Sequence, residues 1–149
     1  MLIGDIMSGK VVTLDPGASV SEAARNMQAA DVGAMPVVDG RGQLLGMLTD
    51  RDIVLRCVAA GRSPSRCRVK EILSGGVVTV SAETTVEEAA QMMARHKIRR
   101  LPVTRRGRLI GMVSLGDLAI RNPLRQSVSE TLLGISRAAG RKKTRRTKL

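Results

Sequence analysis

The chain repeats itself at an interval of 66 residues, and this duplication restricts the possible folds more than any other feature. Val-Val-Thr at 11–13 returns at 77–79, and ten identical pairs fall within residues 11–37 at the same shift. One residue is then lost in a turn, and Arg41-Gly42 returns as Arg106-Gly107 at a shift of 65. The 149 residues therefore contain two copies of one structural unit.

Each copy predicts the element order β-α-β-β-α, which makes the fold class α/β with α+β character. Short β-branched runs at Val11–Leu14 and Val77–Val80 predict strands. Ser19-x-x-Glu22 and Thr85-x-x-Glu88 have the form of a capping box, in which hydroxyl and carboxylate accept from amides at a helix start. The other predicted elements are strands at Met35–Val38, Leu44–Thr49, Leu101–Thr104 and Leu109–Ser114, and second helices starting near Asp50 and Gly116.

The first helix of each copy carries an apolar stripe at helical spacing, which predicts one buried face and no cofactor. The stripes are Val20, Ala23, Ala24 and Met27, and Val86, Ala89, Ala90 and Met93. We expect repeat 1 at residues 1–62 and repeat 2 at 63–123, joined by a linker at 61–68 too short to separate them. A helix at 124–140, capped by Ser127 and Glu130, and a disordered basic tail at 141–149 complete the expected organisation.

Composition and charge exclude several classes of protein. Phe, Trp and Tyr are absent, so the core must be aliphatic, and modules that stack bases on aromatic rings are disfavoured. The formal net charge is +12, but residues 121–149 hold nine basic residues against one acidic residue. The remaining 120 residues therefore carry only +4, which describes a nearly balanced domain with a basic tail rather than a uniformly basic protein.

Reactive side chains are few. Cys57 and Cys67 cannot form the disulfide framework of a small secreted scaffold, and we expect two reduced thiols. With His96 as the single histidine, neither metal-ligand spacing nor Cys-His or Ser-His-Asp machinery is present. The sequence also lacks a phosphate-binding loop, a signal peptide and a membrane-length apolar run, which predicts a cytoplasmic protein that is not an enzyme.

The repeated motifs resemble the cystathionine-β-synthase (CBS) domain family, in the tandem pair called a Bateman module. They are the doubled Val-Val-Thr, the Val-x-Glu-Ala-Ala helix, HKIRRLPV at 96–103, GMLTDRD at 46–52 and GMVSLGD at 111–117. The resemblance spans about residues 2–122. It implies two repeats packed with pseudo-two-fold symmetry, regulatory binding of AMP, ADP, ATP or S-adenosylmethionine in clefts between the repeats, and assembly into disc-like homodimers.

Each copy pairs a hydroxyl at a strand end with a carboxylate in the first turn of the next helix: Thr49 with Asp52, and Ser114 with Asp117. An ionised Asp there can accept hydrogen bonds from two vicinal ribose hydroxyls, while the hydroxyl oxygen and helix amides face a phosphate. The resemblance assigns these residues the same role. The alternative is that each Asp only caps its helix.

Adenine needs a flat apolar slot with backbone hydrogen-bonding groups. The candidates are Val12, Thr13, Met35, Pro36, Val78, Thr79, Leu101 and Pro102, for which the alternative is ordinary strand packing.

The two copies differ in charge. Lys97, Arg99 and Arg100 precede the second strand of repeat 2, where the resemblance implies phosphate-binding cations and the alternative is a solvated loop. The corresponding residues of repeat 1 are Asp31, Gly33 and Ala34, so a phosphate there would depend on Arg51. We therefore expect unequal sites, with phosphorylated ligands bound more tightly beside Asp117.

These features favour a non-catalytic sensor of adenosine-containing ligands that acts on an unknown effector protein. A second hypothesis is a nucleic-acid-binding protein that contacts phosphates through residues 141–149. A third is a ligand-free subunit whose role is dimerisation or protein interaction.

Overall fold

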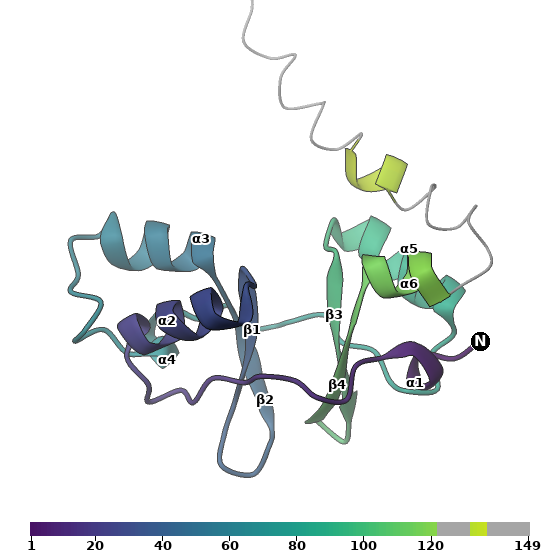
Figure 1. Ribbon diagram of the computed structural model, residues 1–149, viewed down its shortest axis with the longest axis horizontal. Helices are drawn as coiled ribbons and strands as arrows, with labels where there is room; N and C mark the ends of the chain where they lie inside the picture. The colour runs from purple at the N-terminus through teal and green to yellow at the C-terminus, as the bar shows by residue number, and fades with distance from the viewer. Residues whose placement is uncertain (122–131, 137–149) are drawn as a thin grey trace, which may run out of the picture. The chain divides into compact units, whose positions relative to one another are not determined.

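The computed structural model describes residues 1–121 and 132–136. Its elements are, in order, α1 (Ile3–Ile6), α2 (Val20–Ala30), β1 (Ala34–Val38), β2 (Leu44–Thr49), α3 (Asp50–Asp52), the π-helix η1 (Ile53–Val58), α4 (Val69–Ile72), α5 (Val86–His96), β3 (Arg100–Arg105), β4 (Arg108–Ser114) and α6 (Leu115–Arg121) (Figure 1). They form two compact units. Unit 1 comprises Met1–Gly9, Thr79–Arg105 and the chain from Ile110 onward, and unit 2 comprises Lys10–Val78 and Arg106–Leu109.

Each unit contains one antiparallel two-stranded sheet, β3–β4 in unit 1 and β1–β2 in unit 2. In unit 2, Leu14 makes a single parallel bridge to Val37 of β1, and Ser74 makes an antiparallel bridge to Met47 of β2. Unit 1 repeats this arrangement with Val80 on β3 and Ser8 on β4. The mixed helix and strand class predicted from the sequence is confirmed.

The strands predicted at 11–14 and 77–80 are wrong, because only their last residues pair with a sheet. Leu14 donates its amide to Pro36 O at 2.9 Å, and Val80 donates to Pro102 O at 3.0 Å. The next bond toward the N-terminus would require an N–H on Pro36 or Pro102, and proline has none. The ladder therefore stops after one bridge.

The structure contains two short helices, α1 and α4, that were not predicted from the sequence. In unit 1, α1 joins the segment before α5 through Ile3 N to Thr84 O (2.8 Å) and Gly4 N to Ala82 O (2.9 Å). In unit 2, α4 makes the matching bonds, Val69 N to Ala18 O (2.9 Å) and Lys70 N to Pro16 O (3.0 Å). Each short helix thus belongs to the unit built mainly from the other sequence repeat.

The two longest helices begin where their capping residues predict. Thr85 Oγ1 accepts from Glu88 N at 3.2 Å, and a Glu88 carboxylate oxygen accepts from Thr85 N at 3.0 Å, so α5 has a complete capping box. In α2 only half of the box forms, with Ser19 Oγ accepting from Glu22 N at 3.1 Å. Helix α3 begins at Asp50 as predicted, but it passes directly into η1, a rare π-helical geometry.

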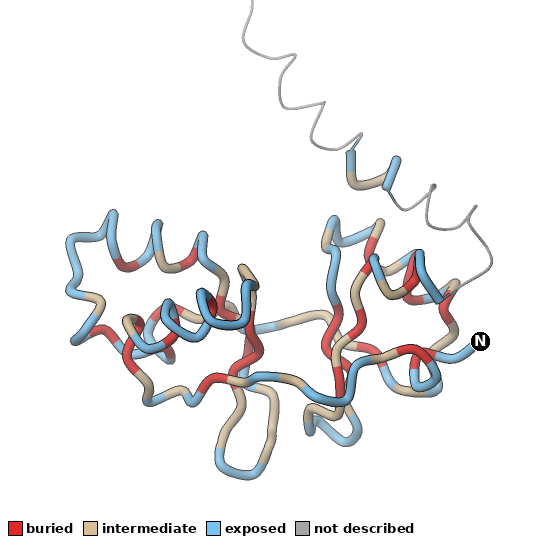
Figure 2. Tube along the Cα trace, in the orientation of Figure 1, coloured by how far each residue is buried: buried red, intermediate tan, exposed pale blue. Residues whose placement is uncertain are grey.

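Buried residues lie along the strands and on the helix sides that face them within each unit (Figure 2). The predicted stripe of α5 is fully buried, but in α2 the expectation is wrong for Ala24, which is exposed while its counterpart Ala90 is 2% exposed. Residues 132–136 form a helical turn whose Gly134 lies against Ala94 of α5, one turn beyond Ala90. Within the described ranges α2 has no such cover.

The turn at 132–136 is the described part of the helix predicted at 124–140. The predicted cap at Ser127 and Glu130 and the basic tail at 141–149 lie outside the described residues.

Candidate functional site

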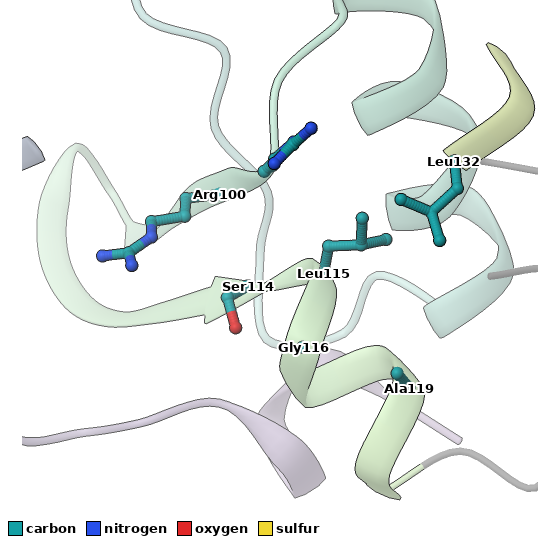
Figure 3. Close-up of a pocket in the computed structure, with 7 residues that line it drawn as sticks. Arg100, Ser114, Leu115, Gly116, Ala119 and Leu132 are labelled. Carbon is teal, nitrogen blue, oxygen red and sulfur yellow. The ribbon is translucent and has the colours of Figure 1, made fainter. Parts of the chain in front are cut away.

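A cavity of about 470 Å³ opens in unit 1 where β3 begins, β4 ends and α6 starts. Its lining residues are Arg99, Arg100, Ser114, Leu115, Gly116, Ala119 and Leu132. Figure 3 shows Arg100 and Ser114 on one side of the view and Ala119 and Leu132 toward the other. The volume lies within the range of about 300–1,000 Å³ that is usual for small-molecule pockets.

Ser114 is tied to Asp117 by three hydrogen bonds. Asp117 Oδ2 accepts from Ser114 N at 2.7 Å and from Ser114 Oγ at 2.8 Å, and Ser114 Oγ accepts from Asp117 N at 3.1 Å. The Asp117 side chain therefore caps α6, as the simpler alternative predicts. Its second oxygen, Oδ1, has no hydrogen-bond or salt-bridge partner in the part of the chain that the structure describes, so it can still accept from a ligand.

The matching pair in unit 2 is more fully occupied. Asp52 Oδ2 accepts from Thr49 N at 3.0 Å, and Thr49 Oγ1 accepts from Asp52 N at 3.0 Å. The other oxygen, Oδ1, lies 3.5 Å from Ser74 Oγ, which donates to it, and 3.8 Å from Arg56 Nε. Asp52 is 9% exposed. Both oxygens of this carboxylate thus have partners in the protein, and the two contacts of Oδ1 are long.

The cavity rim in unit 1 is positively charged. Arg99 and Arg100 are both exposed, and neither forms a salt bridge with any residue in the described ranges. Lys97 does not line the cavity; it is the left-handed residue that ends α5, with φ 56°. Guanidinium groups without an acidic partner are side chains that typically bind phosphate or carboxylate oxygens.

The equivalent position in unit 2 carries the opposite charge. Leu115 N donates to Arg99 O at 2.8 Å, and Asp50 N donates to Gly33 O at 2.9 Å, which identifies these pairs as structural counterparts. A Cβ placed on Gly33 would lie 2.9 Å from Asp50 Oδ2, so this carboxylate covers the glycine. Arg51 is exposed there but is flanked by Asp50, whose Oδ1 accepts from Arg51 N at 2.8 Å.

The residues predicted for adenine are distributed over both units and none lines the cavity. Met35 and Leu101 are 1% and 0% exposed, so their side chains belong to the two cores. Pro36 and Pro102 are also buried, and both offer a carbonyl that already accepts an amide. Thr13, Val78 and Thr79 are half-buried and Val12 is exposed. A role for these eight residues in binding adenine stays a prediction.

Four lining residues were not predicted from the sequence: Leu115, Gly116, Ala119 and Leu132. One signal was available, because the repeat alignment places Leu115 of repeat 2 opposite Asp50 of repeat 1. A leucine in place of an aspartate marks a surface that the two copies use differently. Leu132 lies in the expected C-terminal helix, and its position beside the cavity depends on tertiary structure.

Two further findings concern the described ranges. No three His, Cys, Asp or Glu side chains gather there in a way that could hold a metal ion. None of the helices there has the length and apolar character needed to cross a membrane.

Comparison with known proteins identifies the repeated unit. The family model described as CBS domain matches residues 3–58 and again 69–121. The chain is 42% identical over 134 residues to the CBS domain-containing protein YhcV of Bacillus subtilis, covering 90% of this chain and 94% of that protein. It is 35% identical over 119 residues to Hypoxic response protein 1 of Mycobacterium tuberculosis, covering 80% and 83%.

Solved structures agree. Hypoxic Response Protein I with two coordinated zinc ions matches with a TM-score of 0.77 at 34% identity, over 83% of this chain and all of that one. The CBS domain pair of protein MJ0100, in complex with 5′-methylthioadenosine and S-adenosyl-L-methionine, matches with a TM-score of 0.70 at 28% identity, over 80% and 97%. The chain therefore belongs to the CBS-domain family and carries two CBS domains in tandem.

Proposed function

We propose that this chain is a non-catalytic regulatory module that binds an adenosine-containing ligand with an anionic group in the cavity of unit 1. The observation that carries the proposal is the pair of guanidinium groups, Arg99 and Arg100, which have no acidic partner among the described residues and line a cavity beside Ser114. The related MJ0100 pair, whose structure contains two adenosine derivatives, supports the adenosine part of the ligand.

The polar and apolar parts of the cavity suit the two ends of a nucleotide. The guanidinium forks of Arg99 and Arg100 bind phosphate oxygens. Asp117 does not line the cavity, but its hydrogen bonds to Ser114 hold Oδ2, which leaves Oδ1 to accept from a ribose hydroxyl. Leu115 and Leu132 provide apolar surface for the base.

The same reasoning makes the two units unequal. A phosphate near α3 would meet the Asp50 carboxylate, which covers Gly33 where unit 1 has Arg99. Coulomb repulsion opposes binding there, and a ribose hydroxyl would compete with the existing partners of both Asp52 oxygens. We therefore place the high-affinity site for phosphorylated ligands in unit 1.

Calorimetric titration with adenosine, AMP and ATP tests this assignment, using the variant Arg99→Ala/Arg100→Ala. A hydrogen bond to a charged group contributes about 1.5–3 kcal/mol, so ATP affinity should fall at least about tenfold while adenosine affinity changes little. Arg95→Ala/Arg105→Ala is the matched control, because it removes two exposed cations of unit 1 that do not line the cavity. Equal losses for all three ligands, or equal effects of the two variants, would contradict the proposal.

A second candidate role, self-association, is favoured by one surface. Val54, Leu55 and Val58 of η1 are 55%, 50% and 57% exposed and lie next to one another on the helix. Contiguous apolar surface of this kind is typical of interfaces. We propose that a second copy of the chain covers it, which agrees with the homodimer implied by the family resemblance.

Size-exclusion chromatography with light scattering measures this association. Leu55→Glu should convert dimer to monomer, whereas Ile120→Glu, at an exposed apolar residue on α6 that is 85% accessible, should not. A wild-type protein that stays monomeric at high concentration would contradict the dimer. The nucleic-acid hypothesis concerns residues 141–149, which lie outside the described residues.

A further inference from the structure

The two cysteines, expected from the sequence to be reduced thiols, both lie in unit 2. Cys57 is in η1 and Cys67 directly precedes the short helix α4, and both belong to the same apolar core at 0% and 3% exposure. Both are free, and the Cys57 thiol is among the neighbouring groups that raise the pKa of the Cys67 thiol.

Each cysteine is hydrogen-bonded to one of two consecutive residues, Arg62 and Ser63. Arg62 N donates to Cys57 O at 3.0 Å, and Cys57 Sγ lies 3.6 Å from Arg62 O. Cys67 N donates to Ser63 O at 2.8 Å. Because residues 62 and 63 are adjacent, these contacts bring η1 and the segment before α4 to the same place.

The chain between the two cysteines forms an exposed loop. Residues 59–66, which connect the two cysteines, are exposed except for the half-buried Pro64. Arg62 of this loop forms a salt bridge to Glu71 of α4 at 2.9 Å, with side chains 38% and 39% exposed. Exposed loops with few buried contacts open locally at low free-energy cost, so a small oxidant can reach the pair without global unfolding.

We propose that Cys57 and Cys67 are a redox-sensitive pair that closes to an intrachain disulfide on reaction with a hydroperoxide. The thiolate of one cysteine attacks the peroxide, the O–O bond breaks, and an alcohol or water leaves, which gives a sulfenic acid. The second sulfur then attacks the sulfenic sulfur, the S–O bond breaks, and water leaves with the second thiol proton. Two thiols are oxidised and one hydroperoxide is reduced.

The surroundings of Cys67 determine how readily this happens. Burial raises the pKa of the Cys67 thiol, which disfavours the reactive thiolate in the closed state, while the nearby Arg62 guanidinium opposes that rise. Cys57 and Glu71 also face the thiol, and both raise its pKa. The reaction therefore proceeds mainly from molecules in which the 59–66 loop has opened.

The disulfide would join two elements that a hydrogen bond already connects. Arg56, next to Cys57, donates from Nη1 to Ile72 O at 3.0 Å and lies 3.8 Å from Asp52. A covalent link between Cys57 and Cys67 would fasten η1 to the segment leading into α4, and it would restrict the unfolded chain as well. The oxidised protein should consequently have a higher thermal midpoint.

The test exposes the full chain to hydrogen peroxide, then alkylates it with iodoacetamide in denaturant and measures its mass. Oxidised protein should take up no label and lose the mass of two hydrogen atoms, and dithiothreitol should restore both labelling sites. Since Arg62 and Arg66 lie between the cysteines, trypsin should release two peptides joined by the disulfide. Glu71→Gln, which removes the salt bridge over the loop, should speed closure at least twofold.

Cys57→Ala and Cys67→Ala are the matched variants, and neither should show the reversible mass change. If either fails to fold, the wild-type measurement decides alone. Full labelling of both cysteines after peroxide treatment, disulfides only between chains, or mass gains that dithiothreitol does not reverse would each overturn the proposal.

Discussion

Asp117 combines a structural role and a proposed binding role, and the substitution Asp117→Asn separates them. The carboxylate uses Oδ2 to accept from Ser114 N and Ser114 Oγ, and Oδ1 has no partner in the described ranges. An asparagine oxygen can accept the same two hydrogen bonds, so the cap of α6 is retained. The amide nitrogen then replaces Oδ1 and cannot accept from a ribose hydroxyl.

The expected magnitudes follow from this geometry. Loss of a hydrogen bond to a charged acceptor costs about 1.5–3 kcal/mol, which is about a 10- to 150-fold weaker Kd for AMP or ATP. Loss of the negative charge near the start of α6 should lower the free energy of unfolding by only about 0.3–1 kcal/mol. Asp117→Ala should add the loss of the cap, about 1 kcal/mol further.

Titration calorimetry measures the Kd, and urea unfolding measures stability. Asp52→Asn is the matched control: Asp52 is buried and both its oxygens have partners, so this variant should lose stability yet bind ligand in unit 1 almost normally. If Asp117→Asn bound AMP and ATP as tightly as the wild type, Asp117 would be a helix cap alone and the ribose role would be refuted.

Two further predictions concern stability. In Gly46→Ala the new methyl group would collide with Leu73 Cδ1 and the Ser74 carbonyl oxygen, so the free energy of unfolding in urea should fall by about 1–3 kcal/mol. Gly40→Ala is the control and should be almost neutral, because a Cβ there meets no atom within 4 Å. Equal losses in the two variants would contradict the prediction. The backbone amide of Arg68, aided by the Arg62 guanidinium, lowers the pKa of Glu71 in the folded state. The ionised Glu71 carboxylate therefore stabilises the fold above the ordinary carboxyl pKa, and this stabilisation is lost as the pH falls through the lowered pKa. Any excess in the unfolding free energy of the wild type over Glu71→Gln at neutral pH should therefore disappear in acid. An excess that grew as the pH fell would contradict the lowered pKa of Glu71.

Features that depend on residues close together in the chain could be predicted from the sequence. The duplication located every strand of the two sheets, with β2 at the predicted Leu44–Thr49, because alternation and turn residues are local signals. The caps at Ser19 and Thr85 were equally readable, since their hydrogen bonds join residues three apart. The hydroxyl and carboxylate of Ser114 and Asp117 were found for the same reason.

Contacts between distant residues decided the rest. The predicted first strands form only single bridges, because Pro36 and Pro102 have no N–H to donate to them. The sequence does not show this, since it does not show which strand lies beside these prolines. The helices α1 and α4 are too short to leave a periodic pattern, and the segments that hold them are remote in sequence. Asp52 and Asp117 look alike in the sequence, yet Ser74, 22 residues away, donates to the second oxygen of Asp52 at 3.5 Å. Such partners are fixed by packing and not by local pattern, so only the folded chain distinguishes the two sites.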